Sequence, residues 1–258
     1  MNRTACNVGT WRPTPTEWSA AVAALREVEP EEAARVERFR FAEDRKRALA
    51  GRLLARAAVV RGTGAAWRDV ALRRTEANKP YAALREGVDP PRFNFNVSHH
   101  GDWVAVASHD RLRVGVDVMR FDDPPRGEAA FMESFASYFT PHEWSQIRGA
   151  DAPMRRFYEF WALKESYIKA VGVGLGFPLQ RISFTRAPPH LATAAVDGRE
   201  LADWHFDLGR LDERHCVAVA LGSDADEGPT REDRELHGSA AGARFREVAV
   251  QDLLRLAG

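Results

Sequence analysis

The chain has 258 residues, enough for one large domain or two of modest size, and 45% of them are hydrophobic, as in an ordinary globular protein. Its 37 basic and 37 acidic residues cancel, which argues against a protein that binds nucleic acid through a general positive field. No stretch suits a membrane helix, the N-terminus lacks the apolar core of a signal peptide, and two cysteines are too few for a disulfide framework or a zinc site. We expect a soluble, reduced, cytosolic protein with no membrane or nucleic-acid partner.

Two helices are predicted in the first part of the chain. Apolar residues recur at helical spacing over about residues 16–28, after Pro15. The same spacing recurs over 44–61, and Gly62 follows as a stop signal. Basic residues occupy much of the remainder of this second segment, so a local anion site stays open although a general affinity for polyanions does not.

The hydrophobic period then changes from helix to strand. Residues 93–97 alternate apolar and polar side chains, which indicates a strand. A turn is predicted at 99–102, and further strands over 103–107 and 111–119. Three short strands with tight connections predict an antiparallel meander.

A helical block is predicted over about residues 128–170. Thr140, with Glu143 three residues on, is suited to cap a helix inside this block. The last helix, 154–171, ends in the glycine-rich run 172–176. That run follows a helix rather than preceding one, so a hinge or close-packing turn is a better interpretation than a phosphate-binding loop.

Strands return over residues 181–184, 204–208 and 215–221, so the second half resembles the first. Residues 104–107 and 217–220 even share the sequence Val-Ala-Val-Ala. We predict an α+β fold, a pseudodimer of two similar halves in which each half is a small antiparallel sheet packed with helices.

The domain boundaries follow from this order of elements. We expect an N-terminal half over residues 1–112 and a C-terminal half over 113–222. Residues 223–258 are expected to form a flexible linker, rich in Gly, Ser, Asp and Glu, and an amphipathic C-terminal tail that docks or frays.

Asp117 is the first candidate for chemistry. Alternation along residues 114–119 places three valines on one face of the strand and Gly115, Asp117 and Met119 on the other. A carboxylate that faces a covered interior needs a partner. A solvent-facing Asp on an edge strand is the alternative that spacing alone leaves open.

Glu165 is the second candidate. Trp161, Glu165 and Lys169 fall four residues apart and share one helix face. The alternative is an ordinary exposed Glu–Lys pair, although Trp161 indicates a face that is at least partly covered. One strand carboxylate and one helix carboxylate would suit Mg²⁺, which takes one or two protein carboxylates and fills its other positions with water and phosphate.

Ser98 and His99 end the first predicted strand at a turn. A histidine there donates to a phosphate or simply caps the turn, and the residues around it, taken alone, favour the structural role. A serine hydrolase is disfavoured, because the two residues are adjacent and no nucleophile elbow surrounds them.

Three segments together resemble the phosphopantetheinyl transferase superfamily in its large, pseudodimeric form. They are residues 94–99 (NFNVSH), 115–118 (GVDV) and 161–170 (WALKESYIKA), in that order. The likeness spans roughly residues 30–221, and residues 157–179 are similar in detail to the animal enzymes that serve aminoadipate-semialdehyde dehydrogenase. The resemblance implies two similar α+β halves with coenzyme A in the cleft between them.

The resemblance also implies roles for single residues. Asp117 and Glu165 would be Mg²⁺ ligands. The catalytic set would be Glu165, Lys169 and His99, with Glu165 as the base that acts on the acceptor serine directly or through a metal-bound water, and the other two on phosphate. The implied coenzyme-binding set is Arg35, Arg74, Thr75, Glu76, Ala77, Asn78, Lys79, Asn96, Val97, Ser98, His99, Glu165, Ser166, Tyr167, Ile168 and Lys169.

The implied activity moves 4′-phosphopantetheine from coenzyme A to a serine of a carrier protein, with Mg²⁺ as cofactor, and releases adenosine 3′,5′-bisphosphate. The implied partners are acyl carrier protein domains of fatty-acid synthase and of aminoadipate-semialdehyde dehydrogenase-like proteins, and the chain is expected to be a monomer. Two departures stand out: Met119 replaces a second acid of many relatives, and His100 replaces a glutamine. A non-catalytic coenzyme A-binding scaffold and a plain interaction domain are the rival hypotheses.

Overall fold

The chain folds into two structural units, and the boundary between them follows Leu112. The computed structural model describes residues 5–84, 93–122, 127–187, 191–223 and 245–257. The first unit holds the described residues up to Leu112 together with those from Phe245 onward, and the second holds those from Arg113 to Ser223. Within these described ranges no helix is both long and apolar enough to cross a membrane.

The helices of the first unit are α1 (Pro15–Val28), α2 (Pro30–Glu37), α3 (Ala42–Thr63) and α8 (Val250–Ala257), with a 3₁₀ turn η1 (Trp67–Asp69). A capping box begins α1, because the Thr14 hydroxyl accepts from the Glu17 amide and the Glu17 carboxylate accepts from the Thr14 amide at 2.8 Å. Gly64 ends α3 with a φ of 76°, which suits a residue without a side chain. The helices predicted over 16–28 and 44–61 are confirmed, whereas α2 was not predicted.

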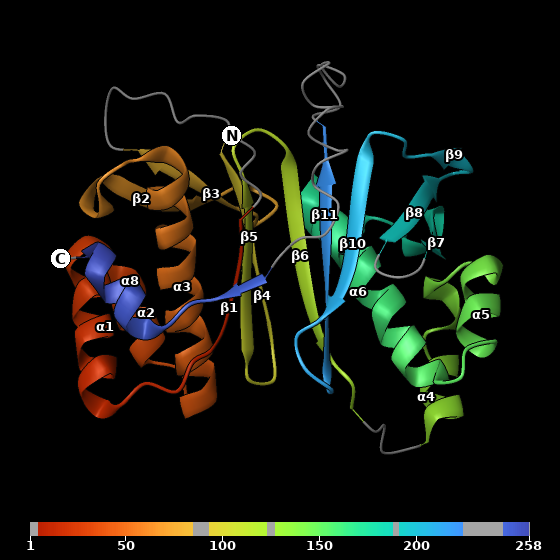
Figure 1. Ribbon diagram of the computed structural model, residues 1–258, viewed down its shortest axis with the longest axis horizontal. Coiled ribbons are helices and arrows are strands. Elements are labelled where there is room, and N and C mark those ends of the chain that lie inside the picture. The colour runs from red at the N-terminus through yellow and green to blue at the C-terminus, as the bar shows by residue number, and fades with distance from the viewer. Residues whose placement is uncertain (1–4, 85–92, 123–126, 188–190, 224–244, 258) are drawn as a thin grey trace. The chain divides into compact units, whose positions relative to one another are not determined.

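The strands of the first unit are β1 (Ala5–Thr10), β2 (Val70–Arg74), β3 (Pro80–Leu84), β4 (Asn94–His100), β5 (Trp103–His109) and β12 (Phe245–Glu247). One sheet has the order β12-β1-β5-β4, and β2 pairs with β3 in a separate hairpin. The long helix α3 packs on β4 and β5 (Figure 1). Gly51 permits this approach, since a Cβ there would lie 3.3 Å from Cγ1 of Val97.

The C-terminal tail docks on the first unit rather than fraying. Strand β12 pairs in parallel with β1, and α8 buries Val250 and Leu253 against the core that includes α1 and α3. Most of the predicted linker, residues 224–244, lies outside the described residues.

The second unit contains the helices α4 (Glu128–Glu133), α5 (Pro141–Arg148) and α6 (Pro153–Val171), with 3₁₀ turns η2 (Ala136–Tyr138), η3 (Gly174–Gly176) and η4 (Leu179–Arg181). Its strands are β6 (Arg113–Arg120), β7 (Ile182–Ala187), β8 (Leu191–Val196), β9 (Arg199–Glu200), β10 (Trp204–Arg210) and β11 (His215–Gly222). The sheet has the order β6-β11-β10-β8-β7, with β9 beside β8. Helix α6 packs across β6 and β11 (Figure 1).

The predicted three-strand meander is wrong. Strands β4 and β5 form a hairpin that turns at Gly101, but β6 pairs along its length with β11, in register Asp117 to Ala218. A tight connection after β5 does not fix the partner of the next strand, and here the chain changes unit at that point. Six further strands were also not predicted: β1, β2, β3, β8, β9 and β12.

The α+β fold class is confirmed. Each unit builds its core from one long helix laid on an antiparallel strand pair, α3 on β4 and β5, and α6 on β6 and β11. The two halves of the chain thus repeat one arrangement, as the order of elements in the sequence indicates.

Candidate active site

Gly115 lets strand β6 approach the backbone of helix α6. A Cβ at this position would lie 2.0 Å from the carbonyl oxygen of Ser166 and 2.5 Å from the amide nitrogen of Ala170, distances that no side chain can occupy. Asp117 is two residues further along β6 and so shares the face of Gly115. The close contact therefore presents Asp117 to the helix turn that carries Glu165 and Lys169.

Asp117 is buried and faces α6. Its side chain is among the buried charged groups, with 5% of the residue exposed, although β6 is the first strand in the order of its sheet. The ammonium of Lys169 donates to Oδ1 of Asp117 at 2.5 Å. The alternative of a solvent-facing Asp on an edge strand is therefore wrong.

Glu165 lies beside this ion pair in an environment that disfavours its charge. Burial raises the pKa of the Glu165 carboxyl above its ordinary value of 4.5, the negative charge of Asp117 raises it further, and the charge of Lys169 opposes both effects. Oε1 of Glu165 is buried and has no hydrogen-bond partner among the described residues. The stripe from Trp161 to Lys169 is thus more than an exposed ion pair along a helix.

The donor set at this place suits one hard divalent cation. Asp117 and Glu165 bring two carboxylates together, and a buried oxygen without a hydrogen bond is available to a ligand. In the described part of the chain, no group of three or more His, Cys, Asp or Glu side chains forms a metal cluster. The prediction that Asp117 and Glu165 hold Mg²⁺ stays a prediction.

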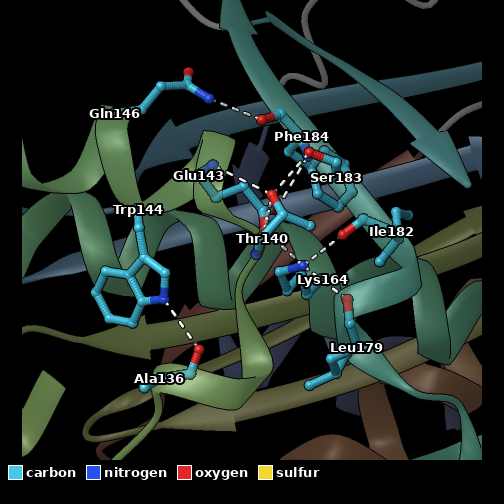
Figure 2. A network of polar contacts seen from close by, with 10 residues as sticks. All are labelled: Ala136, Thr140, Glu143, Trp144, Gln146, Lys164, Leu179, Ile182, Ser183 and Phe184. Atoms are coloured by element: carbon cyan, nitrogen blue, oxygen red, sulfur yellow. Dashed lines mark hydrogen bonds and ion pairs between the residues drawn. The ribbon is translucent and has the colours of Figure 1, made fainter. Parts of the chain in front are cut away.

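Lys164, next to Glu165, anchors α6 in the core of the second unit (Figure 2). Its buried ammonium donates to the carbonyl oxygens of Leu179 at 2.8 Å and Ile182 at 2.6 Å, and lies 2.9 Å from Oε2 of Glu143. Glu143 in turn accepts from the amide of Phe184 at 3.0 Å. Two neighbouring residues of α6 therefore have different roles: Lys164 fixes the helix in the core, and the carboxylate of Glu165 stays available to a ligand.

Glu143 also confirms the predicted helix cap. Its carboxylate accepts from the Thr140 amide at 2.8 Å, and the Thr140 hydroxyl accepts from the Glu143 amide at 3.2 Å, which forms a capping box at the start of α5 (Figure 2). One buried carboxylate thus caps α5, pairs with Lys164 and accepts from a main-chain amide within β7.

Three further predicted coenzyme residues lie in the core of the second unit. Ser166 is fully buried and its hydroxyl donates to the Leu163 carbonyl oxygen at 2.8 Å. Tyr167 packs against Trp204, with ring centroids 4.9 Å apart, and Ile168 belongs to the same core. A coenzyme contact of these three residues stays a prediction.

The predicted coenzyme-binding segment 74–79 is the turn between β2 and β3. Asn78 adopts a φ of 66°, and its amide donates to the Thr75 carbonyl oxygen at 2.8 Å. The Arg74 guanidinium donates to the main-chain oxygen of Asn78 at 3.0 Å, and the Lys79 amide donates to the Thr75 hydroxyl at 3.1 Å. The segment is a turn held by its own hydrogen bonds, in which Glu76 and Ala77 form the tip.

Three arginines of the first unit gather around Glu32. Arg52 pairs with Glu32 at 2.6 Å, and Arg35 lies 3.6 Å from the same carboxylate. Burial lowers the pKa of the Arg74 guanidinium, and the positive charges of Arg52 and, less strongly, Arg35 lower it further. The negative charge of Glu32 has the opposite effect and raises this pKa. The predicted residues Arg35 and Arg74 therefore belong to one cationic cluster, and the prediction missed Arg52.

Strand β4 carries the predicted segment 96–99 in the first unit. Asn96 and Ser98 are buried on one face of the strand, whereas alternation puts Val97 and the exposed His99 on the other face, toward α3. The four residues thus belong to two faces of one sheet, and His99 is the accessible one. Its role on a phosphate stays a prediction.

Family models match the chain in two adjacent stretches. Residues 9–111 match the N-terminal domain of 4′-phosphopantetheinyl transferase, and residues 113–220 match the 4′-phosphopantetheinyl transferase superfamily. The L-aminoadipate-semialdehyde dehydrogenase-phosphopantetheinyl transferase of Pongo abelii is 41% identical over 247 residues, which cover 90% of this chain and 79% of that protein. The chain belongs to the 4′-phosphopantetheinyl transferase superfamily.

Other phosphopantetheinyl transferases match to a similar extent. One from Thraustochytrium sp. is 41% identical over 248 residues, or 91% of this chain and 84% of that protein. Among solved structures, a holo-[acyl-carrier-protein] synthase from Neisseria meningitidis covers 43% of this chain and 97% of its own, with 18% identity and a TM-score of 0.37. The two family matches meet where the structural units divide, next to Leu112.

The residues that sequence reasoning missed in this transferase are those whose partners are distant in the chain. Arg52 reads as one more basic residue on the surface of a helix, and nothing in the local pattern relates it to Arg35 on the preceding helix. Lys164 and Glu143 look like ordinary charged residues on two amphipathic helices. Their pairing depends on how α5 and α6 pack, which local spacing does not encode.

Proposed function

We propose that the chain transfers 4′-phosphopantetheine from coenzyme A to a serine of an acyl carrier protein domain and releases adenosine 3′,5′-bisphosphate. The observation that carries this proposal is the convergence of Asp117, Glu165 and Lys169 where β6 meets α6. All three lie in the stretch that matches the superfamily model, and the relatives are named for this transfer.

Glu165 is the proposed general base. Its pKa is raised by burial and by Asp117, which makes its ionised form a better proton acceptor than an exposed carboxylate. It takes the proton from the serine hydroxyl as the serine oxygen bonds to the phosphorus on the pantetheine side and the bond to the adenosine bisphosphate breaks. Lys169, held by Asp117, is positioned to donate to a phosphate oxygen.

Asp117 and Glu165 are the residues that would hold Mg²⁺. A cation at this place would offset the repulsion between the two carboxylates and give the buried Oε1 of Glu165 a binding partner. Bound there, Mg²⁺ would neutralise charge that develops on the departing phosphate. Met119 supplies no carboxylate and a thioether is a poor ligand for this ion, which leaves further positions to water and phosphate.

The arginine cluster of the first unit is the proposed site for the coenzyme phosphates. Coenzyme A carries a pyrophosphate and a 3′-phosphate, and a guanidinium can hold a phosphate with two parallel donors. Arg35 and Arg52 both lie beside the carboxylate of Glu32, and the charges of these three residues act on the Arg74 guanidinium, so this place keeps a positive charge. The turn 74–79 adds the side chain of Lys79.

The physiological setting is also proposed. The carriers would be those of fatty-acid synthase and of aminoadipate-semialdehyde dehydrogenase-like proteins, which the names of the relatives support for the second. The chain would act as a monomer in the cytosol. The balanced overall charge is consistent with a protein that does not bind nucleic acid or anionic membranes through a general positive field.

Mass spectrometry of an apo acyl carrier protein, incubated with the chain, coenzyme A and Mg²⁺, tests the proposal. A gain of about 340 Da on the carrier is expected, the mass of one phosphopantetheine. EDTA and Glu165→Gln should abolish it, whereas Glu128→Gln, a change of the same kind on the exposed start of α4, should not. Measurable binding of coenzyme A without any transfer would favour a non-catalytic scaffold instead.

A further inference from the structure

Glu29 is the residue at which helix α1 ends and helix α2 begins. Its amide donates to the Leu25 carbonyl oxygen at 2.8 Å, and its own carbonyl oxygen accepts from the Ala33 amide at 3.0 Å. An acidic side chain at the start of a helix commonly binds the first amides of that helix, yet the Glu29 carboxylate makes no capping hydrogen bond to α2. The side chain is 13% exposed, so its contacts lie elsewhere in the protein.

The Glu29 carboxylate binds helix α3 and strand β2. Its Oε1 accepts from Nη2 of Arg56 at 2.5 Å and from the amide of Leu72 at 3.0 Å. The Arg56 side chain is fully buried, and its Nη1 donates to the carbonyl oxygens of Trp67 at 2.7 Å and Val70 at 2.6 Å. One ion pair therefore joins the α1–α2 junction, α3, the turn η1 and the first residues of β2.

The same ion pair lies near two arginines of the cationic cluster around Glu32. Arg35 is on α2, six residues after Glu29, and Glu32 is in the first turn of that helix. Arg52 is on α3, four residues before Arg56 and therefore on the same side of the helix. The ion pair thus joins the start of α2 to the middle of α3, the two segments from which Arg35 and Arg52 extend.

The third arginine of the cluster, Arg74, is held through strand β2. Its guanidinium donates to the main-chain and side-chain oxygens of Asn78, which belong to its own hairpin. Leu72, two residues before Arg74, donates its amide to Glu29. Because only one residue separates the two, a shift of the hairpin at Leu72 would move Arg74 with it.

This buried ion pair does more than fill the core of the first unit. A buried ion pair is by itself weak evidence for stability, because an apolar group of similar volume can often replace it. An apolar group could not bind the three main-chain groups on η1 and β2 that Arg56 and Glu29 hold. The network is therefore suited to keep these segments in one position relative to α2 and α3.

We propose that Glu29 is a positioning residue, which fixes the spacing of the three arginines that would bind the phosphates of coenzyme A. This inference rests on the proposed function, because the arginines act on the donor substrate of that reaction. Glu29 and Arg56 have opposite charges, so the pair adds no net charge to the cluster and acts on binding through geometry. Phosphates are held by donors at defined separations, and a displacement of about 1 Å weakens such a contact strongly.

Two substitutions of Glu29 separate geometry from charge. Glu29→Gln and Glu29→Leu both remove the negative charge, but only glutamine keeps an oxygen that can accept from Arg56 and from the Leu72 amide. We expect the KM for coenzyme A to rise about tenfold in Glu29→Leu with kcat unchanged, and by less than about threefold in Glu29→Gln. Loss of the charge alone would make the site more positive and would lower this KM equally in both variants, since the donor is an anion.

Leu253→Ala is the control for a general loss of stability. Leu253 is 2% exposed in the core of the same unit, on α8, and its truncation destabilises the fold without removing a hydrogen bond of the network. Urea denaturation compares its free energy of unfolding with that of Glu29→Leu, and its KM for coenzyme A should stay unchanged. Glu29→Leu combined with Arg52→Gln should raise this KM by less than the product of the two single increases, because both act on one cluster.

Hydrogen exchange provides a measurement that needs no variant. If the network controls the affinity for coenzyme A, bound coenzyme A must by reciprocity stabilise the network. Exchange of the Leu72 amide should therefore slow about tenfold at saturating coenzyme A, and exchange of the amides of α8 should slow less. This measurement decides the question even if Glu29→Leu does not fold.

The outcomes distinguish the two proposals. If the unaltered chain neither binds coenzyme A nor modifies a carrier, the proposed function fails and this inference falls with it. If transfer occurs but Glu29→Leu and Glu29→Gln change the KM for coenzyme A alike, the positioning role alone is overturned. The same holds if the Leu72 amide exchanges at one rate with and without coenzyme A. A loss of kcat in place of a rise in this KM would also overturn the role, because the network would then act on the chemical step.

Discussion

The ammonium of Lys169 lies 2.5 Å from Oδ1 of Asp117, one on helix α6 and the other on strand β6. This pair keeps a positive charge beside two carboxylates, because Glu165 stands one helical turn before Lys169. The charge of Lys169 lowers the pKa of Glu165 and so opposes the effect of Asp117 on it.

Lys169→Gln should therefore lower the transfer rate. We expect kcat to fall about 100-fold, since a preorganised cation at a reacting phosphate contributes most in the transition state. The rate is measured by mass spectrometry of the carrier. Lys46→Gln removes a lysine from a surface pair with Glu43 in the other unit and should leave kcat unchanged, and equal losses in both variants would contradict the assigned role.

Glu165→Gln should stabilise the metal-free protein at neutral pH while it abolishes transfer. The pKa of Glu165 is raised above its ordinary value of 4.5, so its charge costs folding free energy wherever it is ionised. Below pH 4.5 the carboxyl is neutral in the folded and unfolded chain, and the cost is absent. It appears as the pH rises through the raised pKa.

Thermal melts in EDTA check this sign. The melting temperature of Glu165→Gln should exceed that of the unaltered chain by a few degrees at pH 8 and by less at pH 4. Mg²⁺ should raise the melting temperature of the unaltered chain more than that of the variant. A variant that is less stable at pH 8 would show that the carboxylate is held by favourable contacts.

Gly115→Ala should disrupt the contact on which the site depends. The new Cβ would meet the backbone of Ser166 and Ala170 at 2.0 and 2.5 Å, and a helix backbone cannot yield as a side chain tip can. We expect a loss of about 3 kcal/mol or more in the free energy of unfolding, measured by urea denaturation. Gly209→Ala on β10 is the matched control, since its Cβ would meet only Cγ1 of Val217 at 3.9 Å.

The sequence carries the parts of this site that are local. Alternation singled out Gly115 and Asp117 on one strand face, and helical spacing joined Trp161, Glu165 and Lys169, so both halves of the pair could be predicted. The Thr140 cap of α5 was also readable, because a capping box spans only four residues. Each of these signals lies within one element.

What could not be predicted depends on contacts between elements. The pairing of β6 with β11 joins strands separated by three helices, and a short strand has several partners of similar pattern. Glu29 is a second case, since its carboxylate holds the buried Arg56 at 2.5 Å and the amide of Leu72 at 3.0 Å, on segments far apart in the sequence. Nothing in the residues around Glu29 indicates either partner.

Lys164→Met should cost far more stability than a lysine on the surface. It leaves the buried carboxylate of Glu143 without this cation and removes the ammonium donor from the carbonyl oxygens of Leu179 and Ile182. We expect a loss of about 3–5 kcal/mol in the free energy of unfolding. Lys46→Met should change it by less than about 1 kcal/mol, and a similar loss in both would contradict the role of the buried pair.

Removing the acid as well should not restore this loss. Glu143 accepts from the amides of Thr140 and Phe184 besides its pair with Lys164, so Glu143→Leu combined with Lys164→Met leaves two amides without acceptors. The double variant should therefore remain less stable than the unaltered chain by at least about 2 kcal/mol in the same urea experiment. Full recovery would mean that the network contributes only by charge compensation.

Arg52→Gln should weaken the binding of coenzyme A without changing the chemistry. Arg52 shares Glu32 with Arg35, and its charge acts on the guanidinium of Arg74, so its loss removes one of three cations from the cluster. We expect the KM for coenzyme A to rise about tenfold with kcat unchanged, since a charge-assisted contact to a phosphate is formed equally in the ground and transition states.

Dephospho-coenzyme A, a donor that lacks the 3′-phosphate, distinguishes which phosphate of the coenzyme Arg52 contacts. If the arginines hold the 3′-phosphate, the KM for dephospho-coenzyme A should be high for the unaltered chain and hardly change in Arg52→Gln. Equal increases for both donors would assign Arg52 to the pyrophosphate.

Arg61→Gln, at the exposed last turn of the same helix, should alter neither value, because it lies outside the cluster around Glu32. A change of kcat in Arg52→Gln would contradict a role confined to binding and would place the first unit in the reaction itself.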